Sequence, residues 1–158
     1  MANQQPRTKG EAILEIKYQL QLHSLHQRLY RRLRFLVAFL SLALGSSAIV
    51  GIISPQPWLV AGAGIIIAAL TIVDSLCQWS EMSARHASWR RDMATLLANS
   101  GDLDLKEIDR AIAHHYGEVD DEVRALSYIA YNDVVRGAAH EDWIRVLPPG
   151  SKFLQWIV

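Results

Sequence analysis

Histidines are the residues of this chain whose spacing first suggests chemistry. His23 and His26 stand three positions apart in a segment with helical periodicity, so they share one helix face. Two imidazoles supply half of a tetrahedral zinc site, but no carboxylate stands one turn away to complete it. His114 and His115 are adjacent and point to different sides of a helix. We therefore interpret these histidines as surface or stalk residues and predict no metal site.

Other signals of catalysis are missing from the sequence. It contains no glycine-rich phosphate loop, no HExxH motif and no paired cysteines. The single Cys77 is expected to pack rather than react. Helix caps and solvated helix faces account for the many acids between Asp102 and Glu122. We expect a protein that is not an enzyme and needs no cofactor.

One acid, Asp74, stands where a charge has a functional meaning. It ends a stretch of 39 uncharged residues that begins at Phe35. A carboxylate at the inner end of a membrane span faces the bundle interior or water. In an oligomer, a ring of such carboxylates favours cations at the mouth of a channel. The alternative is an ion pair with Arg31 or Arg34, and the sequence leaves both possibilities open.

The uncharged stretch predicts a transmembrane hairpin. Residues 35–53 and 58–79 are each long enough, at ~1.5 Å per residue, to cross ~30 Å of hydrocarbon. A short Ser-Pro-Gln-Pro turn separates them. In a soluble protein, the remaining residues would have to surround two helices that are apolar on every side, which we consider the weaker alternative. The predicted fold class is an all-α membrane protein with long cytoplasmic helical extensions.

Positive charges set the predicted topology. Arginines crowd both flanks of the hairpin and are absent from its turn, which places both termini in the cytoplasm and indicates an inner-membrane or equivalent protein. The predicted segments are an N-terminal helix (1–34), the hairpin (35–79) and a C-terminal helical region (80–158). The first carries a net charge of +5, and residues 74–158 a net charge of −5, so the cytoplasmic parts should attract each other. The flanking arginines are Arg28, Arg31, Arg32, Arg34, Arg85, Arg90 and Arg91.

Small and polar residues recur at helical spacing within the predicted spans. Small residues let membrane helices approach closely, either in a tight hairpin or dimer or around a central pore. The predicted packing residues are Ala43, Ser47, Gly51, Ala61, Gly64 and Ala68. The predicted pore-lining residues are Ser41, Gly45, Ser46, Thr71 and Asp74.

Two amphipathic stripes predict that both spans continue into the cytoplasm as helices. The N-terminal stripe consists of Leu14, Tyr18, Leu22, Leu25, Leu29 and Leu33. After the second span, a heptad-like seam consists of Trp79, Met82, His86, Trp89, Met93 and Leu96. We expect this seam to pack on the N-terminal helix of the same chain or on a neighbouring subunit. After Gly101, a helix capped by Asp102 or Asp104 and another over 119–136 are expected.

This order of parts, together with Tyr131-Asn132-Asp133, Arg136 and Asp142-Trp143, resembles the SLATT domains. Those are two-span effectors of bacterial conflict systems that are thought to form pores. The resemblance implies a homo-oligomer, tetrameric or larger, that sits in membrane lipid. It also implies control by a nucleotide or oligonucleotide made by an associated nucleotidyltransferase. Phosphates would be attracted to Arg28, Arg31, Arg32 and Arg34, although topology already explains these arginines.

The function expected from these features is a pore-forming channel of an anti-phage defence system that causes abortive infection. Two other classes remain open. One is a membrane-anchored adaptor that recruits a soluble protein through its cytoplasmic helices. The other is a phage lysis or exclusion protein.

Overall fold

The structure, a computed structural model, describes residues 7–46, 55–119 and 122–158. Every regular element in these ranges is a helix, which confirms the predicted all-helical class. The chain forms two compact units, and two long helices belong to both. The bundle unit consists of residues 1–27 and 84–158, and the apolar unit of residues 28–83. Residues 1–27 of the predicted N-terminal segment and residues 84–158 of the predicted C-terminal segment thus share one unit, and the rest of both segments belongs to the other.

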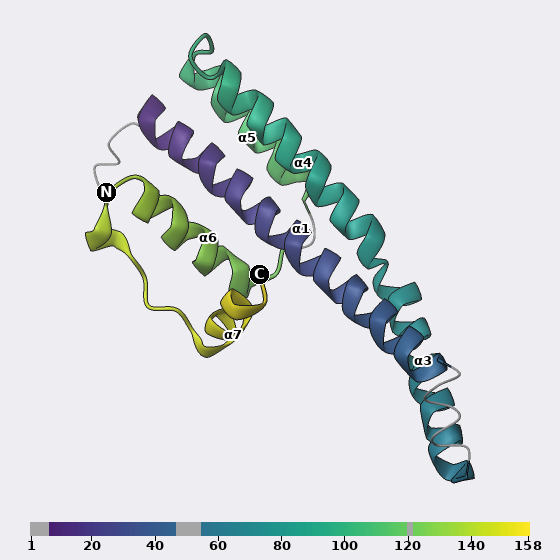
Figure 1. The fold of residues 1–158 in the computed structure, drawn as a ribbon. Helices are drawn as coiled ribbons and strands as arrows, with labels where there is room; N and C mark the ends of the chain where they lie inside the picture. The colour runs from purple at the N-terminus through teal and green to yellow at the C-terminus, as the bar shows by residue number, and fades with distance from the viewer. Residues whose placement is uncertain (1–6, 47–54, 120–121) are drawn as a thin grey trace. The chain divides into compact units, whose positions relative to one another are not determined.

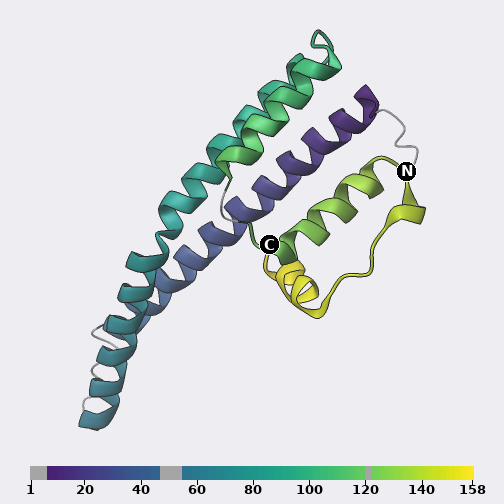
Figure 2. The ribbon, with the colours of Figure 1, turned by 180° about the vertical axis from the view of Figure 1, so that it is seen from behind.

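The bundle unit is built around the first half of α1 (Lys9–Gly45). The second half of α4 (Trp79–Asn99) and α5 (Leu105–Glu118) lie on one side of it, and α6 (Arg124–Gly137) lies on the other (Figures 1 and 2). A short 3₁₀ helix, η1 (Glu141–Trp143), and α7 (Pro149–Ile157) follow.

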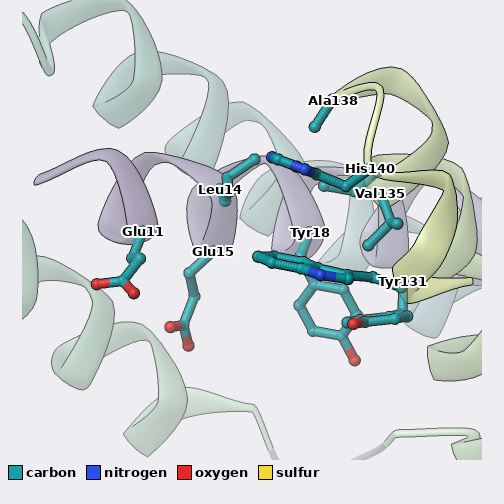
Figure 3. Close-up of a pocket in the computed structure, with 10 residues that line it drawn as sticks. Glu11, Leu14, Glu15, Tyr18, Tyr131, Val135, Ala138 and His140 are labelled. Carbon is teal, nitrogen blue, oxygen red and sulfur yellow. The ribbon is translucent and has the colours of Figure 1, made fainter. Parts of the chain in front are cut away.

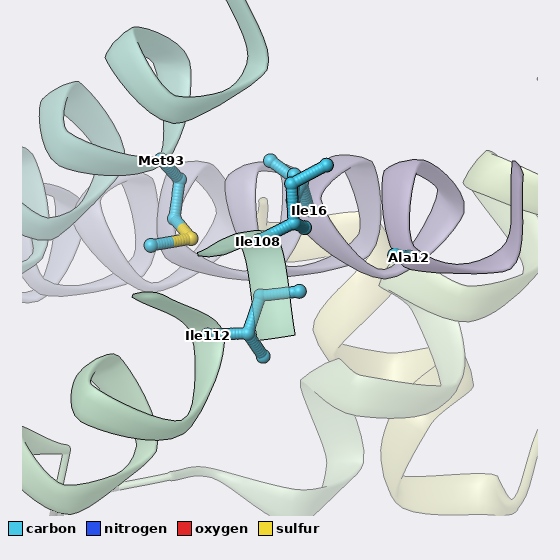
Figure 4. Packing of buried hydrophobic residues seen from close by; sticks show 5 residues of the cluster. All are labelled: Ala12, Ile16, Met93, Ile108 and Ile112. Atoms are coloured by element: carbon cyan, nitrogen blue, oxygen red, sulfur yellow. The ribbon is translucent and has the colours of Figure 1, made fainter. Parts of the chain in front are cut away.

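An apolar cluster joins three of these helices. Ala12 and Ile16 of α1 are fully buried against Met93 of α4 and against Ile108 and Ile112 of α5 (Figure 4). Burial of such side chains contributes roughly 1.5–3 kcal/mol each. At the same end of the bundle, the ammonium of Lys9 donates to the carbonyls of residues 101 and 103, at 3.0 and 2.7 Å. These bonds fix the first turn of α1 against the α4–α5 connection.

The start of α5 follows the expected capping chemistry. The Asp104 carboxylate accepts from the backbone of Glu107 at 2.8 Å, and the Glu107 carboxylate accepts from the backbone of Asp104 at 2.9 Å. This reciprocal box satisfies two helix N–H groups that have no partner within the helix. The start of α6 differs from the prediction, because α5 extends to Glu118 and α6 begins only at Arg124.

The C-terminal tail forms a helix that packs on α6. Pro149 occupies the first turn of α7, where its missing N–H is not needed. The Ser151 hydroxyl is buried and donates to the carbonyl of Ala125 at 2.8 Å. Phe153 and Trp156 remain exposed on the other side of this helix.

The apolar unit contains the second half of α1, all of α3 (Pro57–Cys77) and the first turn of α4. Contacts between residues 34 and 80 and between 45 and 67 show that α1 and α3 run antiparallel here. Gln78 has a left-handed backbone with φ 45°, which separates α3 from α4. Among the described residues, one helix, within Pro57–Asn99, is long and apolar enough to cross a membrane. The first predicted span is described only as far as Ser46, so the two-span hairpin remains a prediction.

Candidate functional site

The predicted pore-lining residues all belong to the apolar unit. Ser41, Ser46 and Asp74 are half-buried, and Gly45 and Thr71 are exposed. The Thr71 hydroxyl donates to the carbonyl of Ile67 one turn earlier, at 2.9 Å, so it is satisfied without water. Within the described ranges no ion pair joins the half-buried Asp74 to Arg31 or Arg34.

The small residues of α3 leave an open helix face. A Cβ at Gly45 would meet a methyl of Ile67 at 3.9 Å, an ordinary contact within the unit. A Cβ at Gly62 or Gly64 would meet none of the described atoms within 4 Å. Ala61 and Ala68 are likewise exposed and Ala43 is half-buried, whereas Ser47 and Gly51 lie outside the described residues. The face around Gly64 is therefore available for a second helix.

The four arginines before the first predicted span are all exposed. The Arg34 guanidinium donates to the Ser80 hydroxyl at 3.0 Å, which joins α1 to the start of α4. Arg28, Arg31 and Arg32 lie along the same helix within the apolar unit. Their exposure fits the membrane flank predicted for them and does not define a ligand pocket.

The predicted seam on α4 is divided between the two units. Trp79 and Met82 belong to the apolar unit, and His86, Trp89, Met93 and Leu96 belong to the bundle unit. In the bundle unit the seam packs on a stripe of α1 that differs from the predicted leucine stripe. That stripe steps by four, three, four and three residues and consists of Ala12, Ile16, Gln19, His23 and His26. The predicted leucine stripe instead directs Leu14 and Tyr18 toward α6.

Four histidines meet in the interior of the bundle unit. His23, His26 and His86 have no exposed surface, and His115 has 3%. The Nδ1 atoms of His23 and His86 are 2.9 Å apart, and the Nε2 atoms of His23 and His115 are 2.7 Å apart. His26 stacks on His86 with ring centres 4.4 Å apart. Of the two interpretations of His23 and His26, surface or stalk residues, the surface one was wrong because both are buried, and we call the four the histidine cluster.

Hydrogen bonds define the protonation of the cluster. His26 Nδ1 donates to the carbonyl of Leu22 at 2.9 Å, and its Nε2 accepts from the backbone of Val123 at 2.9 Å. His26 is therefore a neutral Nδ1–H tautomer. A neutral His23 donates through one ring nitrogen and accepts through the other, which suits its two imidazole partners. Trp89 packs its ring against His23, His86 and His115.

Burial keeps this cluster uncharged. Desolvation, followed by the neighbouring imidazoles, lowers the pKa of both His23 and His86 to about 3. Desolvation also lowers the pKa of His26 and of His115. The ring nitrogens meet in pairs at hydrogen-bond distance, whereas two ligands of one tetrahedral zinc would stand about 3.3 Å apart. Among the described residues no group of histidines, cysteines or acids is arranged to hold a metal ion.

A cavity of about 250 Å³ lies on the opposite side of α1, between this helix, α6 and η1. Figure 3 shows Leu14 and Tyr18 of α1 facing Tyr131 and Val135 of α6, with His140 beside them. The rings of His140 and Trp143 stack with centres 4.6 Å apart and planes 13° from parallel. The remaining lining residues are Glu11, Glu15, Val134 and Ala138. We call this space the aromatic pocket.

The residues that resemble the SLATT ending shape the edge of this pocket. The buried amide of Asn132 holds the backbone of Arg145 twice, accepting from its N–H at 2.9 Å and donating to its carbonyl at 2.7 Å. These two hydrogen bonds position Arg145, whose guanidinium carbon lies 4.1 Å from the centre of the Tyr131 ring. Asp133 accepts from Gln21 of α1 at 2.8 Å and pairs with Arg136 at 3.7 Å. Tyr131 and Trp143 themselves line the pocket.

Comparison with known proteins finds no relative: no family model, no curated protein and no solved structure matches the chain. The arguments about function therefore rest on the geometry of the two units and on the resemblance described above.

Proposed function

We propose that this protein is an oligomeric, pore-forming membrane effector whose bundle unit controls ion conduction by the apolar unit. The observation that carries the proposal is that α3 has no buried residue, although it is almost entirely apolar. Val60, Ile65 and Ile66 are 38%, 71% and 51% exposed, and they point to three different sides of the helix. Apolar surface on all sides of a helix is stable in lipid and not in water.

The second half of α1 supports a spanning hairpin. Phe35, Phe39 and Leu42 are also more than half exposed, on a helix that runs antiparallel to α3. Arg28, Arg31, Arg32 and Arg34 stand before the apolar part of α1, and the next arginine after α3 is Arg85 in α4, so arginines flank the hairpin where the chain enters and leaves the bundle unit. The positive-inside rule then assigns the bundle unit and both termini to the cytoplasm.

Two features of α3 support assembly around a pore. The exposed face formed by Ala61, Gly64 and Ala68 suits close approach by a helix of another subunit. Asp74 lies near the end of this helix, where a ring of carboxylates would select cations. Two helices per subunit are too few to enclose an aqueous path, so we propose a tetramer or a larger ring.

Control by the bundle unit follows from chain continuity. Both α1 and α4 belong to both units, so a rearrangement of the bundle reaches the apolar unit through continuous backbone. A ligand can shift a conformational equilibrium only if it binds one state better, which requires a binding site in the bundle. The proposed role in anti-phage defence and the proposed nucleotide signal rest on the resemblance to SLATT domains.

Ion flux from liposomes that contain the full-length protein tests this function. We expect passage of monovalent ions, and we expect Asp74→Asn to lower cation preference because each subunit loses a charge from the ring. Asp102→Asn removes the same charge from the exposed α4–α5 turn and should leave the preference unchanged.

The adaptor function is the alternative outcome. It is favoured by the exposed Phe153 and Trp156 on α7, which offer a surface to a soluble partner. No flux with or without ligand, together with copurification of a soluble protein that Trp156→Ala releases, would replace the channel by the adaptor.

A further inference from the structure

We infer that the aromatic pocket binds a nucleotide, with the base between its aromatic walls and the phosphate at Arg124 and Arg145. The inference rests on the proposed function in one respect: that function requires a ligand of the bundle unit, and the nucleotide would be this ligand. Binding itself can be measured without conduction.

The walls of the pocket suit a flat ring. Tyr18, Tyr131, His140 and Trp143 contribute aromatic surface from α1, α6 and η1. Trp143 stacks on His140 and is still 55% exposed, so part of its ring remains available for contact with a ligand. Aromatic side chains stack on nucleobases with little regard to base identity, because every base has a π-face. The volume of about 250 Å³ is enough for a ring system and leaves a sugar and phosphate outside.

A second, smaller cavity supplies the positive charge. It measures about 180 Å³, shares Tyr18 and Tyr131 with the aromatic pocket, and is lined by Arg124 and Arg145 together with Ser127 and Tyr128. Neither arginine forms an ion pair within the described ranges of the chain. The Asn132 side chain holds the backbone of Arg145 through two hydrogen bonds, and the Arg145 guanidinium lies over the Tyr131 ring. Guanidinium groups match phosphate oxygens in planar pairs, so this cavity suits a phosphate.

The acids at the other end of the aromatic pocket are already engaged. Both oxygens of Glu15 accept hydrogen bonds, from Arg7 at 2.8 Å and from the Tyr116 hydroxyl at 2.6 Å. The Glu11 carboxylate accepts from the backbone and hydroxyl of Thr8, at 2.7 and 3.0 Å. The Arg7 guanidinium balances the charge of Glu15 within the protein, whereas Arg124 and Arg145 form no ion pair in the described ranges and are available to an anion. The charges therefore favour an anionic ring compound over a cationic one.

One acid opposes the phosphate and provides a test. The pKa of the Tyr18 phenol is raised, first by desolvation and next by the negative charge of Glu122. Burial in turn raises the pKa of Glu122. Glu122 stands two residues before Arg124, which lines the second cavity, so its negative charge should weaken phosphate binding and Glu122→Gln should strengthen it.

Isothermal titration of the full-length protein in detergent tests the inference, with AMP, GMP, CMP and UMP as probes. We expect binding of the monophosphates, weaker binding of adenosine, and no binding of inorganic phosphate alone. Trp143→Ala should weaken binding roughly 10- to 100-fold through loss of stacking, whereas Trp143→Phe should retain most of it. Arg145→Gln should weaken binding roughly 10-fold and reduce its dependence on salt.

Matched controls are available in the same unit. Trp156→Ala removes an exposed tryptophan from α7, and Arg110→Gln removes an exposed arginine from α5. Neither should change the affinity. Dissociation constants weaker than about 1 mM for all four monophosphates would overturn the inference. So would tighter binding of tyramine than of AMP, or equal effects of Trp143→Ala and Trp156→Ala. If liposomes conduct ions in any of these cases, the channel stands and only the ligand site is wrong.

Discussion

The two units of this protein distribute polar and apolar side chains in opposite ways. In the bundle unit, Gln19 and the histidine cluster are buried, with exposed fractions of 3% or less. In the apolar unit, large side chains such as Phe35 and Ile65 are 71% exposed. Under the proposed function, the bundle unit lies in water and the apolar part of the other unit lies in lipid.

The energetic consequence of burying or exposing a side chain therefore differs between the two units. A buried imidazole must find hydrogen bonds, and His23 and His26 do so with other histidines and with backbone groups. An exposed isoleucine in lipid needs no partner. The bundle unit is consequently sensitive to protons, whereas the apolar unit is sensitive to inserted charge.

The largest expected effect is acid destabilisation of the bundle unit. The pKa of His23 and of His86 is about 3 in the folded protein, against an ordinary value near 6.5. The unfolded state therefore binds more protons below pH 6.5, so stability is complete above that pH and is lost as the pH falls toward 3. From pH 7 to pH 5 we expect a loss of about 2 kcal/mol for each of the two histidines.

Hydrogen exchange of the α5 amides, corrected for intrinsic rates, measures this loss. His86→Gln should make the pH dependence shallower. His114→Gln, which changes an exposed histidine on the same helix as His115, should leave it unchanged. A stability that stays constant from pH 7 to pH 5 would show that the cluster is not buried in solution.

The next effect comes from a charge placed in the apolar unit. Ile65→Lys puts an ammonium near the middle of α3, which costs about 3 kcal/mol in a membrane. We expect a large fall in the amount of protein that resists alkaline extraction from membranes. Phe153→Lys places the same charge at a similarly exposed apolar residue of α7 and should have little effect. Equal extraction of both variants would contradict the assignment of different solvents to the units.

The smallest effect compares two polar side chains. Asn132→Ala removes both hydrogen bonds that hold Arg145 and should destabilise the bundle unit by roughly 2 kcal/mol. Thr71→Val removes a hydroxyl that bonds only to its own helix, and the free energy of unfolding should change by less than about 0.5 kcal/mol. Thermal unfolding followed by circular dichroism measures both. A larger loss for Thr71→Val would mean that its hydroxyl bonds another subunit.

Local chemistry made several elements predictable from the sequence. The Asp104 cap needs only a carboxylate and a glutamate three residues later. The apolar composition after Pro57 predicted a span over 58–79, and one described helix, within Pro57–Asn99, is long and apolar enough to cross a membrane. The start of α6 was not predictable in the same way, because acids favour a helix N-terminus, yet Glu118 ends α5 and α6 begins only at Arg124.

The histidine cluster and the aromatic pocket depend on contacts between distant segments. His23 meets partners 63 and 92 residues away, and no local pattern encodes those distances. The steps of four and three residues from Ala12 to His26 fit one face of a helix. The stripe includes polar side chains, however, so a pattern of apolar residues alone does not predict it. The pocket likewise joins Tyr18 to Tyr131 and Trp143, which required the fold to be known.

Cysteine labelling tests the central claim, that the apolar unit lies in lipid and the bundle unit in water. In a Cys77→Ser background, single cysteines replace Ile65, Ile66 or Phe153, all of which are more than half exposed. A water-soluble maleimide reacts with the thiolate, which forms readily only in water. In permeabilised native membranes we expect rapid labelling of Phe153→Cys, and labelling of Ile65→Cys and Ile66→Cys only after detergent is added. Equally rapid labelling of all three cysteines before detergent would contradict the account.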